Sequence, residues 1–237
     1  EWAWYVDKIG RWVDFDHAYR TTDQKYMESV IWAFKQMYDK KLIYEGIYTS
    51  MYCTTCGTPV SHFAVAMDNS YKDFEDPAIT VAFKILNEGA FKNVHLLAWT
   101  TTPWTIPSNK ALVVDPKEDY LIFEDGTAEK KYICAQKRFD SVAGRRNFKV
   151  GDRIKGKDLF GLRYEPAYSF YSSSEKDFKV YEYEGMVNME EGTGIVHSAP
   201  GFGEIDTEMG RHFGIQIMTS MDSEGNFTPG DNKANPY

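Results

Sequence analysis

The pattern of apolar and polar positions divides the chain into two parts. Up to residue 46 the apolar side chains recur at helical spacing, which predicts two helices with one apolar face each. These faces comprise Trp2, Tyr5, Val6 and Ile9 in the first helix, and Met27, Val30, Ile31, Phe34 and Tyr38 in the second. Thr21 and Gln24 have the spacing of a capping box, so we expect the second helix to begin there and its apolar stripe to pack in a core.

From Asp76-Pro77 onward, short apolar runs alternate with turns that are rich in glycine, proline and aspartate. Such runs are typical of strands. The expected strands cover residues 79–85, 94–99, 111–114, 120–123, 132–134, 178–187, 194–197 and 215–218. The expected helices of this part cover residues 135–143 and 204–213. The sequence therefore predicts a mixed α/β protein with helical segments at its amino-terminal end.

Composition narrows the class of protein. The chain has 237 residues, a formal net charge of −8 and a pI near 5.2, which argues against a broad nucleic-acid-coating surface and leaves room only for local contacts. No apolar run reaches membrane-spanning length, and the first residues lack a signal-peptide pattern, so we expect a soluble, cytosolic protein. Three cysteines do not make a disulfide framework.

One stretch, residues 97–109, combines uncharged hydroxyls with rigidifying residues. An apolar run leads into Thr100–Thr102, and Pro103 and Pro107 then predict a stiff, non-helical turn. Together with the Asn109 amide, the hydroxyls can donate and accept hydrogen bonds without carrying charge, which suits a sugar, a backbone or a water. The alternative is a strand end whose hydroxyls cap neighbouring backbone groups.

A second stretch, residues 192–206, favours a binding site over a strand end with capping hydroxyls. It reads Gly-Thr-Gly-Ile-Val-His-Ser-Ala-Pro-Gly-Phe-Gly-Glu-Ile-Asp. Together with Thr-Thr-Thr-Pro-Trp-Thr at residues 100–105, it resembles the editing (CP1) domain of isoleucyl-tRNA synthetase, in its cytosolic, eukaryotic-like form. The valyl and leucyl relatives are expected to differ at Thr102 and His197. Residues 10–46 resemble the segment that joins the aminoacylation core to this domain, so the resemblance covers nearly the whole chain.

The resemblance implies a division of the chain and a fold. Residues 1–50 would be a helical linker to the aminoacylation core, and residues 51–237 the editing domain. The editing domain would be a mixed α/β fold around a twisted, barrel-like β-core with flanking helices, β-rich from about residue 76. The aminoacylation signatures His-Ile-Gly-His and Lys-Met-Ser-Lys-Ser are absent from the sequence, so ATP binding and amino-acid activation are expected only of the parent enzyme.

The resemblance also implies roles for named residues. The catalytic set would be Thr101, Thr102 and Asp206, and the substrate-binding set Thr100, Trp104, Thr105, Asn109, His197 and Phe202. Asp206 would anchor the α-ammonium of the amino acid, the threonines would hold the terminal ribose and the attacking water, and His197 would limit the size of the amino-acid pocket. Other interpretations stay open for Asp206 as stabiliser of a helix start, and for His197 as a structural histidine.

Cys53 and Cys56 have the spacing of a zinc-ligand pair, but a structural zinc site needs four ligands and the sequence has no second pair. We interpret them as two reduced cysteines in a turn. The alternative is half of a zinc site, because in synthetases of this group a second ligand pair can come from beyond the editing domain. No cofactor is expected for the hydrolysis itself.

These observations favour one function over two alternatives. The expected activity is hydrolysis of valine mischarged to isoleucine tRNA, with valyl-adenylate as a further substrate. The expected partners are the 3′ acceptor end of that tRNA and the remainder of a parent synthetase; we expect a monomer that does not bind membranes. The alternatives are the editing domain of the valyl or leucyl relative, and a non-catalytic module that binds a tRNA acceptor end or a protein.

Overall fold

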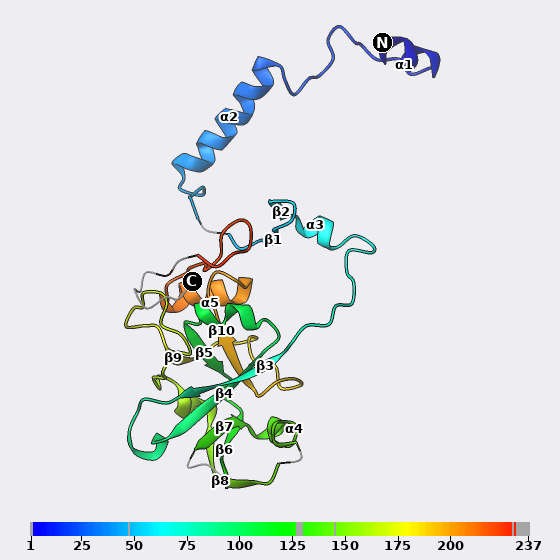
Figure 1. Ribbon diagram of the computed structural model, residues 1–237. Helices are drawn as coiled ribbons and strands as arrows, with labels where there is room; N and C mark the ends of the chain where they lie inside the picture. Colours follow the sequence, from blue (N-terminus) through cyan, green and yellow to red (C-terminus); the bar gives the residue numbers. More distant parts are fainter. Residues whose placement is uncertain (1, 47, 127–129, 145, 229, 231–237) are drawn as a thin grey trace. The chain divides into compact units, whose positions relative to one another are not determined.

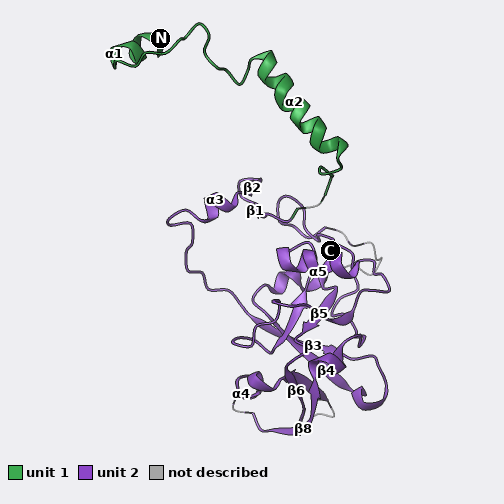
Figure 2. Ribbon diagram, turned by 180° about the vertical axis from the view of Figure 1, so that it is seen from behind, with its two compact units in different colours: residues 1–48 green, residues 49–237 purple. Residues whose placement is uncertain are grey.

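The computed structural model describes residues 2–46, 48–126, 130–144, 146–228 and 230. The chain forms two compact units, residues 1–48 and residues 49–237 (Figure 2). Within the described residues no helix has both the length and the apolar composition that a membrane span requires.

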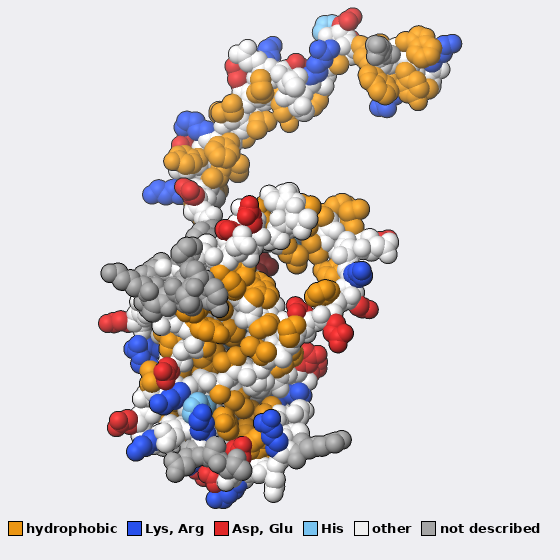
Figure 3. Space-filling model, viewed as in Figure 1, with side chains coloured by type: hydrophobic (Ala, Val, Ile, Leu, Met, Phe, Trp, Pro, Cys, Tyr) orange, Lys and Arg blue, Asp and Glu red, His pale blue; other side chains and the backbone are white. Residues whose placement is uncertain are grey.

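The first unit contains two helices, α1 (Trp2–Lys8) and α2 (Gln24–Asp39). The expected helices are therefore present, but the predicted capping box is wrong. Asp23 occupies the N-cap position without a side-chain capping bond, and Gln24, the first helical residue, instead donates to Glu28 at 3.0 Å. The apolar stripe of α2 is exposed rather than packed in a core, as the row of apolar side chains along it shows (Figure 3).

The second unit begins with a small hairpin and is dominated by one curled sheet (Figure 1). The hairpin pairs β1 (Met51–Cys53) with β2 (Thr58–Val60), and the short helix α3 (His62–Val65) follows. The strands of the sheet are β3 (Ile79–Lys84), β4 (Val94–Thr100), β5 (Ala111–Val114), β6 (Asp119–Asp125), β7 (Lys131–Ala135), β8 (Phe148–Lys155), β9 (Lys179–Glu182) and β10 (Ile195–Ser198). This mixed α/β architecture with a curled, partly closed sheet confirms the predicted fold class.

Strands far apart in the sequence lie side by side in this sheet. Its order is β8-β6-β7-β4-β10-β5-β9, with β3 on β4. Strand β4 is parallel to β7 and β10, and β5 is parallel to β9, whereas the pairs β3–β4, β5–β10, β6–β7 and β6–β8 are antiparallel. The insertion of β10 between β4 and β5 brings the two motif segments together.

All four side chains of strand β5 are apolar, and the strand is covered on both faces. Leu112 and Val114 point into the main core, and Ala111 and Val113 into a second core with Met209 of α5 (Glu204–Phe213). The predicted bounds of α5 are confirmed. The remaining short helices are η1 (Gly89–Phe91), η2 (Pro103–Ser108), η3 (Gln136–Arg138), α4 (Phe139–Ala143) and η4 (Gly156–Leu159).

Two local predictions are wrong because the backbone forms short-range hydrogen bonds in these segments. Residues 215–218 form no strand: Gly214 ends α5 in the left-handed region, and Ile215 then donates to Gly210 of the helix at 2.8 Å. Residues 103–108, expected to be non-helical, form the 3₁₀ helix η2. Its shorter hydrogen-bond period accommodates Pro103 in the first turn and Pro107 inside.

Candidate functional site

The threonine segment leaves the sheet at the end of β4. Thr100 is buried, and its hydroxyl accepts a hydrogen bond from the Thr102 amide at 3.0 Å and contacts the Thr102 hydroxyl at 3.2 Å. Its side chain therefore caps the turn. This is the alternative considered above, in which a hydroxyl at the strand end caps a neighbouring backbone group. Thr101 and Thr102 are exposed, so their hydroxyls are the ones that a bound molecule can reach.

The second motif runs beside the first. Val196 of β10 pairs with Trp99 of β4 in parallel register, and His197 pairs with Leu112 of β5. Parallel strands end at the same edge of a sheet, so Thr100 and His197, each one residue beyond the paired position, emerge together. The sheet thus assembles one site from the two segments.

His197 is buried and hydrogen-bonded through both ring nitrogens. The Asn109 amide nitrogen contacts His197 Nδ1 at 2.8 Å, and the Thr105 hydroxyl contacts His197 Nε2 at 2.9 Å. An amide nitrogen can only donate, so Nδ1 accepts and the proton of the neutral ring lies on Nε2. Burial lowers the pKa of His197 to about 4, so the ring is neutral near pH 7. Neither nitrogen is available as a general base.

This burial predicts a loss of stability in mild acid. The unfolded chain protonates His197 near its ordinary pKa of 6.5, and the folded protein only near 4, so the unfolded state binds more protons as the pH falls between these values. We expect the free energy of unfolding to decrease by about 2 kcal/mol from about pH 7 to about pH 5 through this group.

Urea unfolding of the chain and of its His197→Gln variant at both pH values measures this term. Burial raises the pKa of Asp206, and this group acts in the opposite direction, so the comparison must be made between the two proteins. Equal changes in both proteins would show that His197 is not responsible.

A small cavity lies against these groups. It has a volume of about 220 Å³, and its lining includes Thr100, Thr101 and His197. Its other lining residues include Trp99, Met186 and Asn188. The sequence gives no sign that Met186 and Asn188 belong to the site, because they precede the motif in a stretch without a distinctive pattern. The cavity has room for an aliphatic side chain.

Asp206 lies in the first turn of α5. Its carboxylate accepts a hydrogen bond from the Ala199 amide at 2.9 Å, which ties the helix start to the end of β10. Burial raises the pKa of Asp206, and the Ala199 amide partly opposes this change. Gly203 leaves space for this carboxylate, because a β-carbon there would lie 2.2 Å from its second oxygen and would displace it. Asp206 is not among the residues that line the small cavity.

The structure separates the two aromatic candidates from this cavity. Trp104 and Phe202 pack edge to face with their ring centroids 5.4 Å apart. Trp104 lines a different, largely apolar groove of about 320 Å³ together with Tyr168 and Phe227. In contrast, the structure brings Thr105 and Asn109, both buried, into direct contact with His197.

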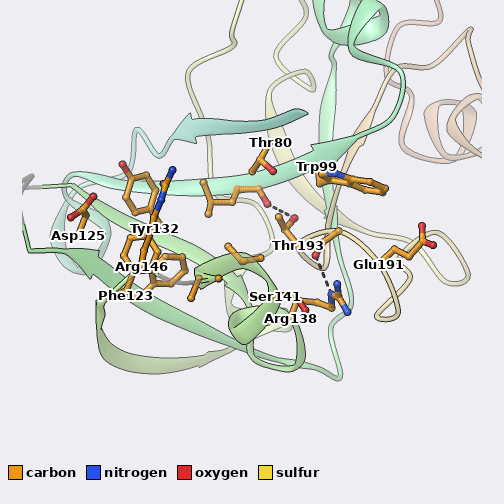
Figure 4. A pocket seen from close by; sticks show the side chains of 16 residues that line it. Thr80, Trp99, Phe123, Asp125, Tyr132, Arg138, Ser141, Arg146, Glu191 and Thr193 are labelled. Carbon is orange, nitrogen blue, oxygen red and sulfur yellow. Dashed lines mark hydrogen bonds between the residues drawn. The ribbon is translucent and has the colours of Figure 1, made fainter. Parts of the chain in front are cut away.

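A larger cavity of about 1010 Å³ adjoins the small one, with Trp99, Gly192 and Thr193 lining both (Figure 4). Arg138 anchors residues 190–194, the glycine segment, which lie between the two cavities. Its guanidinium donates to the carbonyl oxygens of Gly192 at 3.0 Å and Glu190 at 2.7 Å. The opposite side of the cavity carries the other labelled aromatic and basic side chains, Phe123, Tyr132 and Arg146. No motif marks these residues in the sequence.

The cysteine pair lies at the β1–β2 hairpin, with Cys53 at the end of β1 and Cys56 in the turn. The Cys56 amide donates to Cys53 Sγ at 3.4 Å, and this bond is the main cause that lowers the pKa of the Cys53 thiol. Within the described part of the chain, no group of three or more His, Cys, Asp or Glu side chains is placed to hold a metal ion. The state of this pair stays a prediction.

Residues 1–187 match the family described as tRNA synthetases class I (I, L, M and V), and the chain belongs to this family. Its relatives include the isoleucine–tRNA ligases of Rickettsia canadensis (strain McKiel), 40% identical over 96% of this chain, and of Corynebacterium diphtheriae, 39% identical over 96%. The predicted resemblance to the isoleucyl enzyme is thereby confirmed, whereas its eukaryotic-like form stays a prediction. The chain spans only 21% and 23% of these relatives.

Two solved structures of editing domains are also similar. The crystal structure of GlLeuRS-CP1 has a TM-score of 0.49 and 20% sequence identity, and covers 57% of this chain and 59% of that one. The editing domain of the Plasmodium falciparum cytosolic leucyl-tRNA synthetase has a TM-score of 0.41 and 19% identity, with 50% and 47% covered.

Proposed function

We propose that residues 49–237 hydrolyse the ester bond of valine mischarged to isoleucine tRNA, as the editing domain of a larger cytoplasmic synthetase. Valyl-adenylate, in which the same amino acid is joined to the phosphate of adenosine monophosphate as a mixed anhydride, is a further substrate. The observation that carries the proposal is the small cavity bordered by a neutral, fixed histidine and by the exposed Thr101, with the exposed Thr102 next to it in the chain. Such a cavity can select an uncharged side chain by size alone.

The energetic need for a second site supports this proposal. One methylene changes binding by only ~1–3 kcal/mol, and isoleucine against valine is the standard example of this limit. A synthetic site for isoleucine therefore accepts some valine, and hydrolysis in a smaller cavity corrects the error. His197 suits the boundary of that cavity because its two hydrogen bonds hold the ring in one orientation.

The remaining roles follow from exposure and charge. Thr101 and Thr102 present hydroxyls that position the terminal ribose and the attacking water, and Thr100 holds their turn. Asp206 supplies the carboxylate for the α-ammonium of the amino acid. Because His197 is hydrogen-bonded at both nitrogens, the water must be activated by positioning and by the substrate's own ribose hydroxyl.

The larger cavity supports a tRNA acceptor end as the partner. It joins the small cavity at Trp99 and Gly192, and it offers aromatic and arginine side chains, which stack on and pair with nucleotides. Elsewhere, acidic and basic side chains are interspersed on the face shown in Figure 3, and the net charge is −8. Binding of tRNA by this chain alone should accordingly be weak and local.

The test compares hydrolysis of valyl-tRNA and isoleucyl-tRNA by the chain and by its His197→Ala variant. We expect the unmodified chain to hydrolyse the valyl ester faster. Removal of the imidazole enlarges the cavity, so the variant should lose this preference by about tenfold, since an extra methylene is worth ~1–3 kcal/mol.

The control variant is His212→Ala, which removes an exposed histidine of α5 that does not line the small cavity. It should keep the preference for valine. A chain that binds the acceptor end but hydrolyses neither ester, at high protein concentration and also within the parent enzyme, would be a binding module instead.

A further inference from the structure

Tyr164 lies behind the candidate site and is absent from both motif segments. It is 1% exposed, its amide donates to the Phe178 carbonyl at 3.0 Å, and its ring packs edge to face on Phe83 with centroids 5.2 Å apart. Its hydroxyl makes a short hydrogen bond of 2.6 Å to Asn109 Oδ1. Burial raises the pKa of Tyr164 well above its ordinary value, so this hydroxyl stays protonated.

The hydrogen bonds of Asn109 define the orientation of its amide. Because Oδ1 can only accept, Tyr164 must be the donor in their hydrogen bond. On the other side, Nδ2 donates to the Ala111 carbonyl at 3.0 Å and to His197 Nδ1 at 2.8 Å. A flipped amide would direct its oxygen at the Ala111 carbonyl oxygen. One donor and one carbonyl acceptor thus fix the amide from both sides.

A row of hydrogen bonds connects Asn109 to the threonine segment, and each bond fixes the direction of the next. Asn109 donates to Nδ1 of His197, which leaves the proton on Nε2 to be donated to the Thr105 hydroxyl at 2.9 Å. The Thr105 hydroxyl in turn donates to the Thr102 carbonyl at 2.8 Å. All residues of this row except Thr102 are buried. Breaking any of these hydrogen bonds would leave a buried polar group unsatisfied and would lower the free energy of unfolding.

We propose that Tyr164 is a positioning residue that, through Asn109, fixes the tautomer and ring orientation of His197 and so sets the amino-acid selectivity of the site. Its effect on selectivity rests on the proposed function, whereas its effect on the tautomer does not. Tyr164→Phe keeps the ring but leaves Asn109 Oδ1 buried without its donor. The amide then shifts, Nδ1 of His197 loses its fixed donor, and the ring gains a second tautomer.

The first measurement is nuclear magnetic resonance of the imidazole nitrogens in the unmodified chain, with the His197 signals assigned by their loss in His197→Gln. We expect a single Nε2–H tautomer, with scalar coupling across the hydrogen bond between Asn109 Nδ2 and His197 Nδ1. In Tyr164→Phe the Nδ1–H form should appear beside it. A Nδ1–H tautomer in the unmodified chain overturns the proposal without any variant having to fold.

The second measurement is the ratio of valyl to isoleucyl ester hydrolysis. We expect Tyr164→Phe to lower this ratio about tenfold, while Tyr181→Phe leaves it unchanged. Tyr181 is the matched control because it is also buried and its hydroxyl also makes a 2.6 Å hydrogen bond, to the Lys176 carbonyl. An unchanged tautomer in a folded Tyr164→Phe variant contradicts the inference. A changed tautomer with no hydrolysis in either protein contradicts only the proposed function.

Discussion

Asp206→Asn is expected to lower the rate of valyl-tRNA hydrolysis by about 100-fold or more, comparable to the loss of one electrostatic contact in other active sites. Asparagine has the same shape, and its side-chain oxygen can still accept the hydrogen bond from Ala199. What it lacks is the negative charge that we assign to the α-ammonium of the substrate. Deacylation measured under single-turnover conditions gives the rate without a contribution from product release.

Glu208→Gln provides the control for this substitution. Glu208 lies two residues further along α5, is exposed, and loses the same charge on the same helix. It should leave the rate within about twofold, because exposed charges are screened by solvent. If both variants hydrolyse the ester at the unmodified rate, Asp206 serves only to stabilise the helix start, and a small change in unfolding free energy would be its one effect.

Gly194→Ala is expected to destabilise the second unit by about 3 kcal/mol, through backbone strain and overpacking. Gly194 has a φ of +74°, and an added β-carbon would lie 2.3 Å from the β-carbon of Ala135 and 3.1 Å from the sulfur of Met189. Ala135 cannot move aside, because it ends β7 and its amide donates to the Thr193 carbonyl at 2.8 Å. The substitution should therefore separate the glycine segment from the sheet.

Gly161→Ala isolates the backbone contribution. Gly161 has a nearly equal φ of +78°, but no heavy atom lies within 4 Å of the position that its β-carbon would take. We expect a loss of only about 1 kcal/mol for this variant in urea unfolding. Equal losses in the two variants would mean that the contact with Ala135 relaxes at little cost.

The sequence by itself determined much of the local structure and the kinds of side chain that the candidate site contains. Alternating apolar runs bounded by glycine and proline predicted most strands of the sheet, and Gly203 and Gly214 bracket α5 at its predicted ends. The threonine and histidine segments were also visible, because their hydroxyls and glycines stand next to one another in the chain. These features depend on side-chain period and backbone freedom, which are local properties.

Only the tertiary structure decided which residues meet. The insertion of β10 between β4 and β5 places His197 beside Asn109 and Thr105, whereas Trp104 and Phe202 pack together away from the small cavity. The wrong strand prediction at residues 215–218 has a local cause instead, since Ile215 donates to Gly210 and so closes the end of α5. Tyr164 shows the same limit, because a lone tyrosine carries no sequence signal, and only the packing of the core brings its hydroxyl to Asn109 and so determines the proton position on His197.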